Sequence, residues 1–329
     1  MRDLSSLPKA NLHLHLTGAM RRETMRELAA QRGLEPPDLS DARSPTGFQR
    51  AYDGARAVIQ TATDIRRIVG EAAVDDARDG ARWIEIQVDP TSYVDRFGSL
   101  RGATEIVLDA AAAATTATGV GIGIIIAASW TYAPEHVIAL AELAADYADD
   151  GVVGFGVSND ERQGHVPDFA PACRVASAAG LRIVPHSGAV VPAAHVADCV
   201  NLLGAHRIGH GLAAARDRKV LTLLASRGVV VELCPSSYPG LIVATAADIP
   251  LRVFLEAGVS VALGSDDPLL FGGGLADQYR ITRTELGLTD RELADLARAS
   301  IVGSCAPIQV KRSMQEGVDT WVAAPDPGT

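Results

Sequence analysis

The sequence has few cysteines and no long apolar segment. Its four cysteines are Cys173, Cys199, Cys234 and Cys305. Because no two of them form a C-x-x-C pair, neither a thiolate zinc site nor a compact disulfide framework is indicated, and we expect reduced core thiols. No uninterrupted apolar run reaches the roughly 20 residues that span a bilayer. The segment from Met1 to Leu4 lacks a secretory apolar region. We therefore expect a cytoplasmic protein with no membrane partner.

Basic residues are also in the minority. The chain carries 40 acidic and 30 basic side chains, which gives a formal net charge of −10. This balance argues against a nucleic-acid partner or an anionic membrane surface, since either would favour clustered lysine and arginine. We expect a small-molecule substrate instead. The alanine-rich helices can face either solvent or a second subunit, so the oligomeric state stays open.

No linker, internal repeat or shift in composition divides the chain. With 47% apolar and 21% charged residues, the composition is that of a globular protein with a large core. We therefore expect one metal-dependent hydrolase domain over residues 1–329, with disorder only in the tail from Ala323 to Thr329.

Short apolar runs alternate with alanine-rich helical stretches along the sequence. The eight runs cover residues 11–16, 82–88, 121–127, 152–157, 181–185, 207–209, 229–233 and 259–263. Most are too short and too continuously apolar for half-exposed antiparallel strands, and helices separate them, as in repeated β-α units around a buried parallel sheet. The pattern predicts an α/β fold of the (β/α)8 TIM-barrel type.

One connection is longer than a single crossover helix. It covers residues 19–71 and includes Pro36-Pro37 and a helical pattern over residues 48–59. We expect a helical insertion after the first strand, beside the mouth of the barrel.

Polar residues stand where the predicted strands end. His13 and His15 end the first strand, His186 the fifth and His210 the sixth, and Asp266 with Asp267 follows the eighth. Barrel enzymes build their active sites at the carboxyl ends of the strands. These residues, far apart in sequence, are therefore expected to converge on one site.

Four of these residues form a plausible ligand set for one metal ion. His13 and His15 are two positions apart, so on a strand both face the same way. Such a pair alone is also compatible with two polar side chains at a strand end. Adding His186 and Asp266 completes a set of three nitrogens and one oxygen, which suits Zn2+ and is also tolerated by Fe2+ and Mn2+. A zinc ion there would activate water at neutral pH.

The neighbouring residues have expected catalytic or binding roles. His210 lies between glycines and fits a group that stabilises the activated water, although a structural histidine is the alternative. Asp266 can both bind the metal and accept a proton from the water, and Asp267 can accept a hydrogen bond from the substrate or cap the next segment. The remaining histidines are expected to be structural or on the surface: His136, His165, His195 and His206.

At this point the sequence resembles the adenosine deaminase family of the amidohydrolase superfamily. The resemblance is carried by residues 8–16, 208–211, 234–237 and 265–268 and extends from about Leu7 to Pro307. It implies the barrel fold, the same four zinc ligands, assistance from His210, and an Asp267 that holds a purine ring nitrogen.

Departures from the family pattern fall on the substrate side. The family reads His-Ala-Gly-Glu where this chain reads His186-Ser187-Gly188-Ala189, so Ala189 replaces the glutamate that protonates the purine ring. A positioned acid is worth about 10^2 to 10^4 in rate, so deamination of adenosine should be severely impaired. The other substrate-side departures are Thr17 for aspartate, Gln87 for arginine, Gly156 for aspartate and Asn159 for glycine. We place Thr17, Asn159, Ala189 and Asp267 on the substrate side of the site.

Three functions are compatible with an intact metal set and an altered substrate side. The preferred one is hydrolysis of a C–N bond in another amino-heterocycle or nucleoside-like compound. The second is hydrolysis of an amide or cyclic amide with Asp266 as the sole proton shuttle. The third is a non-hydrolytic or non-catalytic metal-binding protein. Asp89, Asp160 and Glu161 follow the second and fourth strands and are alternative acids, although structural roles suit them better.

Overall fold

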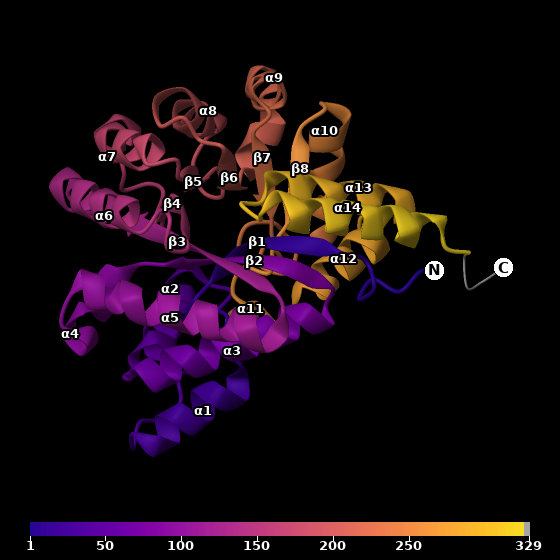
Figure 1. Cartoon of the computed structure of the whole chain (residues 1–329). Helices are drawn as coiled ribbons and strands as arrows, with labels where there is room; N and C mark the ends of the chain where they lie inside the picture. Colours follow the sequence, from indigo (N-terminus) through magenta and orange to yellow (C-terminus); the bar gives the residue numbers. More distant parts are fainter. Residues whose placement is uncertain (326–329) are drawn as a thin grey trace.

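The computed structural model describes residues 1–325. Of the predicted disordered tail, Ala323 ends the last helix, and residues 326–329 lie outside the described residues. Eight parallel strands form one sheet in sequential order (Figure 1). They are β1 (Lys9–His15), β2 (Ala81–Val88), β3 (Gly121–Ser129), β4 (Val152–Ser158), β5 (Arg182–Ser187), β6 (Arg207–His210), β7 (Val230–Leu233) and β8 (Ser260–Leu263). The predicted TIM barrel is confirmed, and every predicted strand lies within two residues of an observed one.

The barrel closes at its mouth through a site residue. Leu14 of β1 forms a parallel bridge with Asp266, which lies just beyond β8. The His15 amide donates to the Asp266 carbonyl over 3.1 Å, and the Asp266 amide donates to the His13 carbonyl over 2.8 Å. The backbone that joins the first and last strands therefore also fixes the aspartate beside the two histidines.

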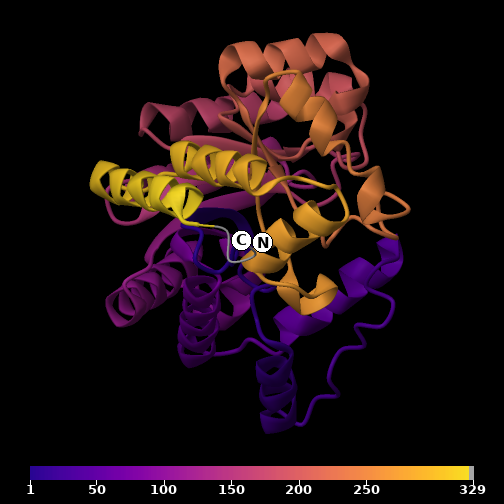
Figure 2. The same ribbon diagram turned by 90° about the vertical axis from the view of Figure 1, so that its right-hand side faces the viewer.

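Helices surround the sheet and supply the outer side of the core (Figures 1 and 2). The α-helices are α1 (Arg22–Gln31), α2 (Pro45–Ala57), α3 (Ala62–Arg78), α4 (Val94–Phe97), α5 (Leu100–Thr118), α6 (Pro134–Asp146), α7 (Val166–Ala178), α8 (Ala193–Leu202), α9 (Arg218–Arg227), α10 (Leu251–Glu256), α11 (Pro268–Phe271), α12 (Leu275–Thr284), α13 (Asp290–Gly303) and α14 (Ile308–Ala323). Three short 3-10 helices are η1 (Pro90–Tyr93), η2 (Leu212–Arg216) and η3 (Ala246–Asp248).

The insertion after β1 is shorter than predicted. It consists of α1 and α2, whereas α3 begins at Ala62 and packs against β2 and α5 as a regular barrel helix. A capping box between Thr61 and Asp64 starts α3 at that point, because it satisfies free amides of the first turn. Within the insertion, α2 contacts α11, and the ring of Phe48 stacks on that of Phe271 at 5.8 Å.

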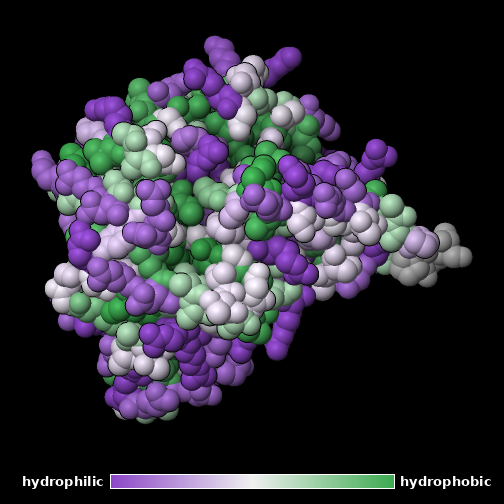
Figure 3. All heavy atoms as spheres, in the orientation of Figure 1, coloured by the Kyte–Doolittle hydropathy of each residue, from purple (hydrophilic) through white to green (hydrophobic). Residues whose placement is uncertain are grey.

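The outer surface is mixed in character. Hydrophilic residues are dispersed among apolar ones over the face in Figure 3. Among residues 1–325, every helix is too short or too polar to cross a membrane.

Candidate metal centre

The four predicted metal ligands converge at the carboxyl ends of the strands. His13 and His15 project from β1, His186 from β5, and one ligand nitrogen of each lies within 4.8 Å of the others. The Nε2 atoms of His15 and His186 are 3.2 Å apart. Asp266 Oδ1 lies 3.5 Å from Nε2 of both His13 and His15. Three nitrogens and one oxygen therefore face a common point.

A buried carboxylate holds His13 from behind. Glu232 Oε2 lies 2.8 Å from His13 Nδ1, and both side chains are fully buried. This contact leaves His13 Nε2, which has no hydrogen-bond partner among the described residues, pointing into the site. Metal-binding histidines usually donate their other ring nitrogen to a carboxylate or carbonyl. The contact thus presents the Nε2 lone pair to an ion.

Glu232 is itself held by a buried arginine. Arg207 donates to Glu232 through Nε and to Glu85 through Nη2, and all three side chains are at most 2% exposed. Glu85 also accepts hydrogen bonds from the Trp83 indole and the Cys305 amide. A continuous polar chain through the barrel core therefore ends on His13, a predicted metal ligand.

The electrostatics of the cluster favour a bound cation. Burial alone would lower the pKa of His13, but the nearby carboxylates of Asp266 and Glu232 raise it to about 10, so the two carboxylates attract positive charge to this point. Burial lowers the pKa of His15 to about 3 and brings that of His186 well below its usual value. The neutral imidazoles of His15 and His186, together with the attraction for a cation at His13 and Asp266, suit Zn2+ or a similar divalent ion.

His210 lies beside the ligand cluster rather than in a separate place. Its ring centroid is 5.0 Å from those of both His13 and His186, and Tyr238 Oη lies 3.3 Å from its Nδ1. Burial lowers the pKa of His210 to about 4, which leaves the ring neutral. Its φ of 68° and the φ of 59° at Asp266 are left-handed, a conformation that costs energy in residues with a side chain. Both residues are thus held in strained positions at the site.

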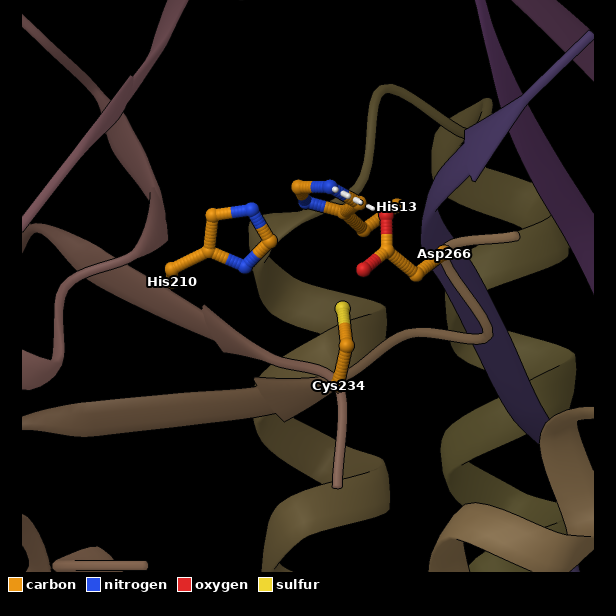
Figure 4. Close-up of side chains that lie close together, drawn as sticks. All are labelled: His13, His210, Cys234 and Asp266. Carbon is orange, nitrogen blue, oxygen red and sulfur yellow. Dashed lines mark ion pairs between the residues drawn. The ribbon is translucent and has the colours of Figure 1, made fainter. Parts of the chain in front are cut away.

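Cys234 lies in the site, although the sequence predicted it only as a core thiol within the 234–237 motif and gave it no role there. Its Sγ and ligand atoms of His13, His210 and Asp266 all lie within 4.8 Å of one another, and the four side chains point toward one another in Figure 4. Burial and the nearby carboxylates raise the pKa of the thiol well above its usual value. The available signal was alternation, because Cys234 stands two residues after the inward-facing Glu232.

Asp267 and Thr17 lie next to the ligand cluster. Asp267 is 2% exposed, and its Oδ1 has no hydrogen-bond partner among the described residues. Burial and the charge of Asp266 raise the pKa of Asp267 well above its usual value. Thr17 Oγ1 lies 2.9 Å from the Tyr93 hydroxyl. Asp267 therefore keeps an unused polar atom at the mouth, whereas the hydroxyl of Thr17 is already engaged.

Ala189 lies in a loop that a neighbouring acid holds in place. Glu161, 3% exposed, accepts hydrogen bonds from the amides of Gly188, Ala189 and Val190 at 3.0 to 3.2 Å. Burial raises the pKa of Glu161, against the effect of these amides. Its oxygens are occupied by the backbone of the loop, which favours a structural role.

The other two alternative acids are also engaged. Asp89 accepts hydrogen bonds from the Tyr132 hydroxyl at 2.6 Å and the Thr91 amide at 2.9 Å. Asp160 forms an ion pair with Arg162 at 2.7 Å. Both carboxylates are therefore engaged by neighbouring groups.

The remaining substrate-side residues differ in their surroundings. Asn159 ends the β4 region with a φ of 68°, and its side chain is exposed. Gln87 is 1% exposed, and neither atom of its amide has a partner among the described residues. A Cβ placed on Gly156 would lie 3.6 Å from Gln87 Oε1, so these two positions are neighbours.

The four histidines expected to be structural lie outside the ligand cluster. His136 Nε2 lies 2.9 Å from Thr91 Oγ1, and His165 Nδ1 lies 3.3 Å from Asp168. His195 Nδ1 lies 2.7 Å from Ser187 Oγ, and His206 Nδ1 accepts the Ile183 amide at 3.0 Å. Each therefore has a local partner.

Comparison with known proteins agrees with this geometry. The family model for adenosine deaminase matches residues 8–321. A Streptomyces coelicolor protein named "Putative adenosine/adenine deaminase" is 48% identical, covering 98% of this chain and 99% of its own. The aminodeoxyfutalosine deaminase of the same organism is 34% identical, covering 98% and 86%. The crystal structure of adenine deaminase from Arthrobacter aurescens superposes with a TM-score of 0.87 at 30% identity, covering 96% of this chain and 99% of that one.

Proposed function

Because this chain belongs to the adenosine deaminase family, we propose that it is a metal-dependent deaminase of an amino-heterocycle or nucleoside-like compound other than adenosine. One contrast carries the proposal. His13, His15, His186 and Asp266 converge as a complete ligand set, whereas Ala189 supplies no acid where the family has one. If the protein had lost its activity, we would expect substitutions among the metal ligands as well as among the substrate-side residues.

The ligand set suits one zinc ion, with Fe2+ and Mn2+ as the alternatives that metal analysis would distinguish. When bound, such an ion activates water for attack and polarises the atom under attack. The carboxylate of Asp266 is ionised, because His13 and the neighbouring imidazoles lower its pKa against the effect of burial. It can therefore accept a proton from the attacking water. The neutral His210 ring can hold that water by a hydrogen bond.

Asp267 is the residue best placed to orient the substrate. Its Oδ1 is buried without a partner, and an unpaired buried polar atom costs about 1 to 3 kcal/mol unless a bound molecule satisfies it. A heterocycle with a ring N–H or an acceptor nitrogen would supply that partner. In this arrangement Asp267 would recognise the ring of the substrate. The residues around Thr17 would recognise the substituent on that ring.

The missing acid limits the choice of substrate. Adenosine requires protonation of a ring nitrogen as the water adds, and the loss of a positioned acid costs about 10^2 to 10^4 in rate. A heterocycle that is more electrophilic at the reacting carbon needs less help. Relatives named as adenine deaminase and aminodeoxyfutalosine deaminase support a family whose members act on different substrates.

Hydrolysis of an amide or cyclic amide is the second candidate. It is favoured because Glu161, an alternative acid, is engaged by the backbone of the loop. With the Glu161 oxygens occupied by loop amides, Asp266 is the one ionised carboxylate in the ligand cluster. A single carboxylate suffices for an amide, because it can take the proton from water and return it to the leaving nitrogen.

The test is ammonia release by the metal-loaded protein from aminopurines, aminopyrimidines, pterins and their nucleosides, with Ala189→Glu in parallel. We expect turnover of a non-adenosine amine by the parent and a gain on adenosine in the variant. A parent that prefers adenosine would contradict the proposal. Silence of the parent on every amine and amide, with one metal ion stably bound, would favour a non-catalytic metal-binding protein.

A further inference from the structure

A second cavity lies at the opposite end of the barrel from the metal centre. Its volume is about 390 Å3, and it is formed where β5, β6 and β7 begin. Arg182 and Arg207, the first residues of β5 and β6, line it together with His206 and Arg227. The metal ligands stand at the other ends of the strands, so this cavity is separate from the site already described.

Two of the three arginines that line this cavity have no acidic partner among the described residues. Arg182 and Arg227 form no ion pair or hydrogen bond through their side chains with other residues of the range 1–325, and both are exposed. Arg207 forms the buried inner wall, and Glu85 and Glu232 engage it from the barrel side. The lining of the cavity contains no carboxylate among the described residues.

Burial and the positive charge at this cavity lower the pKa values of two nearby basic groups. Burial lowers the pKa of His206, and the charges of Arg182 and Arg207 lower it further. Lys311, whose Nζ donates to the Val302 carbonyl at the cavity edge over 3.1 Å, has a pKa lowered by burial and by the same two arginines. In a chain with a net charge of −10, such repulsion between cations would be relieved by a bound anion.

We propose that this cavity binds phosphate or the phosphate group of a small phosphomonoester. Two free guanidinium groups match the geometry of phosphate oxygens through paired N–H donors. The His206 ring adds Nε2, since its Nδ1 already accepts the Ile183 amide. The volume holds a phosphate together with part of an attached group, being within the range of small-molecule sites.

The test is isothermal titration of the metal-loaded protein with inorganic phosphate, AMP and adenosine, using the parent, the double variant Arg182→Ala/Arg227→Ala and the control Arg66→Ala. Arg66 is an exposed arginine of α3 with no ion pair within the described chain. We expect phosphate and AMP to bind the parent and the control, and the double variant to lose about tenfold or more in affinity.

Two results would overturn the proposal. One is that the parent binds neither phosphate nor AMP. The other is that the double variant binds these ligands as tightly as the parent does. If that binding disappears when the metal is removed, the phosphate binds at the metal centre instead. If AMP binds through the cavity and phosphate does not, the site is for phosphomonoesters; the reverse result identifies free phosphate. Circular dichroism of each variant separates loss of binding from loss of fold.

Discussion

Glu232 and His13 form the contact on which the metal centre is built, with Glu232 Oε2 2.8 Å from His13 Nδ1 and neither side chain exposed. The carboxylate fixes both the orientation of the ring and the nitrogen that carries the proton. Since Arg207 holds the other oxygen of Glu232, the orientation of this predicted metal ligand depends on residues outside the cluster of predicted ligands. This relationship yields the first prediction.

Glu232→Gln should weaken metal binding about 10- to 100-fold, because partners of this kind contribute that much to affinity. Competition with a chelator of known affinity measures the change. Glu316→Gln, at an exposed position of α14, is the matched control and should bind metal like the parent. Unchanged affinity in a folded Glu232→Gln protein would show that His13 is oriented by packing alone.

Removal of one direct ligand should have a larger effect. His186→Ala takes away one of three imidazole nitrogens that lie within 4.8 Å of one another. We expect the purified protein to carry well under one metal ion per chain by elemental analysis, and hydrolysis to fall with it. His206→Ala removes a histidine that lies outside the ligand cluster and should retain full metal content. Full occupancy in the His186 variant would exclude that residue from the ligand set.

Gly18 is required by the close approach of Asp267. A Cβ at Gly18 would lie 1.8 Å from Asp267 Oδ1 and 2.7 Å from its Cα, so the backbone itself must move. Gly18→Ala should cost about 1 to 3 kcal/mol in the free energy of unfolding, the usual penalty for overpacking, and should raise KM by displacing Asp267. Chemical denaturation and steady-state kinetics measure the two effects.

Gly70 provides the matched control for that substitution. It lies within α3, and an added Cβ there would meet nothing within 4 Å. Gly70→Ala should stabilise the protein by up to about 1 kcal/mol, because alanine is the better helix former. If Gly18→Ala and Gly70→Ala changed the free energy of unfolding equally, the contact with Asp267 would not be what requires glycine at position 18.

The sequence was sufficient to predict the barrel and the ligand cluster, for a physical reason. Strand periodicity and strand-end positions are local properties, and a closed parallel barrel brings its carboxyl ends together wherever they stand in the chain. The contacts that orient the ligands are not local. Glu232 meets His13 from a strand 219 residues away, and nothing in its own segment distinguishes it from a core carboxylate paired elsewhere.

On the substrate side, too, contacts between distant segments could not be predicted from the sequence. Glu161 is followed by Arg162, a pattern that fits an exposed loop acid, yet the structure buries it against the amides of residues 188–190. The boundary of the insertion was wrong for a related reason. The expected insertion extended to residue 71, whereas the cap at Thr61, a short-range signal, begins the barrel helix α3 at Ala62.

Asp76 should make the stability of the protein depend on pH. Its carboxylate is 5% exposed and accepts a hydrogen bond from Asn11 Nδ2 over 2.9 Å, and burial raises its pKa to about 7. A carboxyl whose pKa is higher in the folded than in the unfolded chain stabilises the fold at low pH. This contribution is complete below about pH 4 and is lost as the pH rises toward 7.

Asp76→Asn should therefore remove this pH dependence, because the amide stays neutral and its carbonyl can still accept the Asn11 hydrogen bond. We expect the variant to gain stability relative to the parent between pH 4 and 7, by an amount on the order of 1.4 kcal/mol for each unit of pKa shift. Urea unfolding at pH 4.5 and pH 7.5 measures it, with the exposed Asp149→Asn as control. If the difference in the free energy of unfolding between variant and parent is the same at both pH values, Asp76 has the same pKa in the folded and unfolded chains. The effect of its burial would then be fully offset by Asn11 and the nearby Lys9.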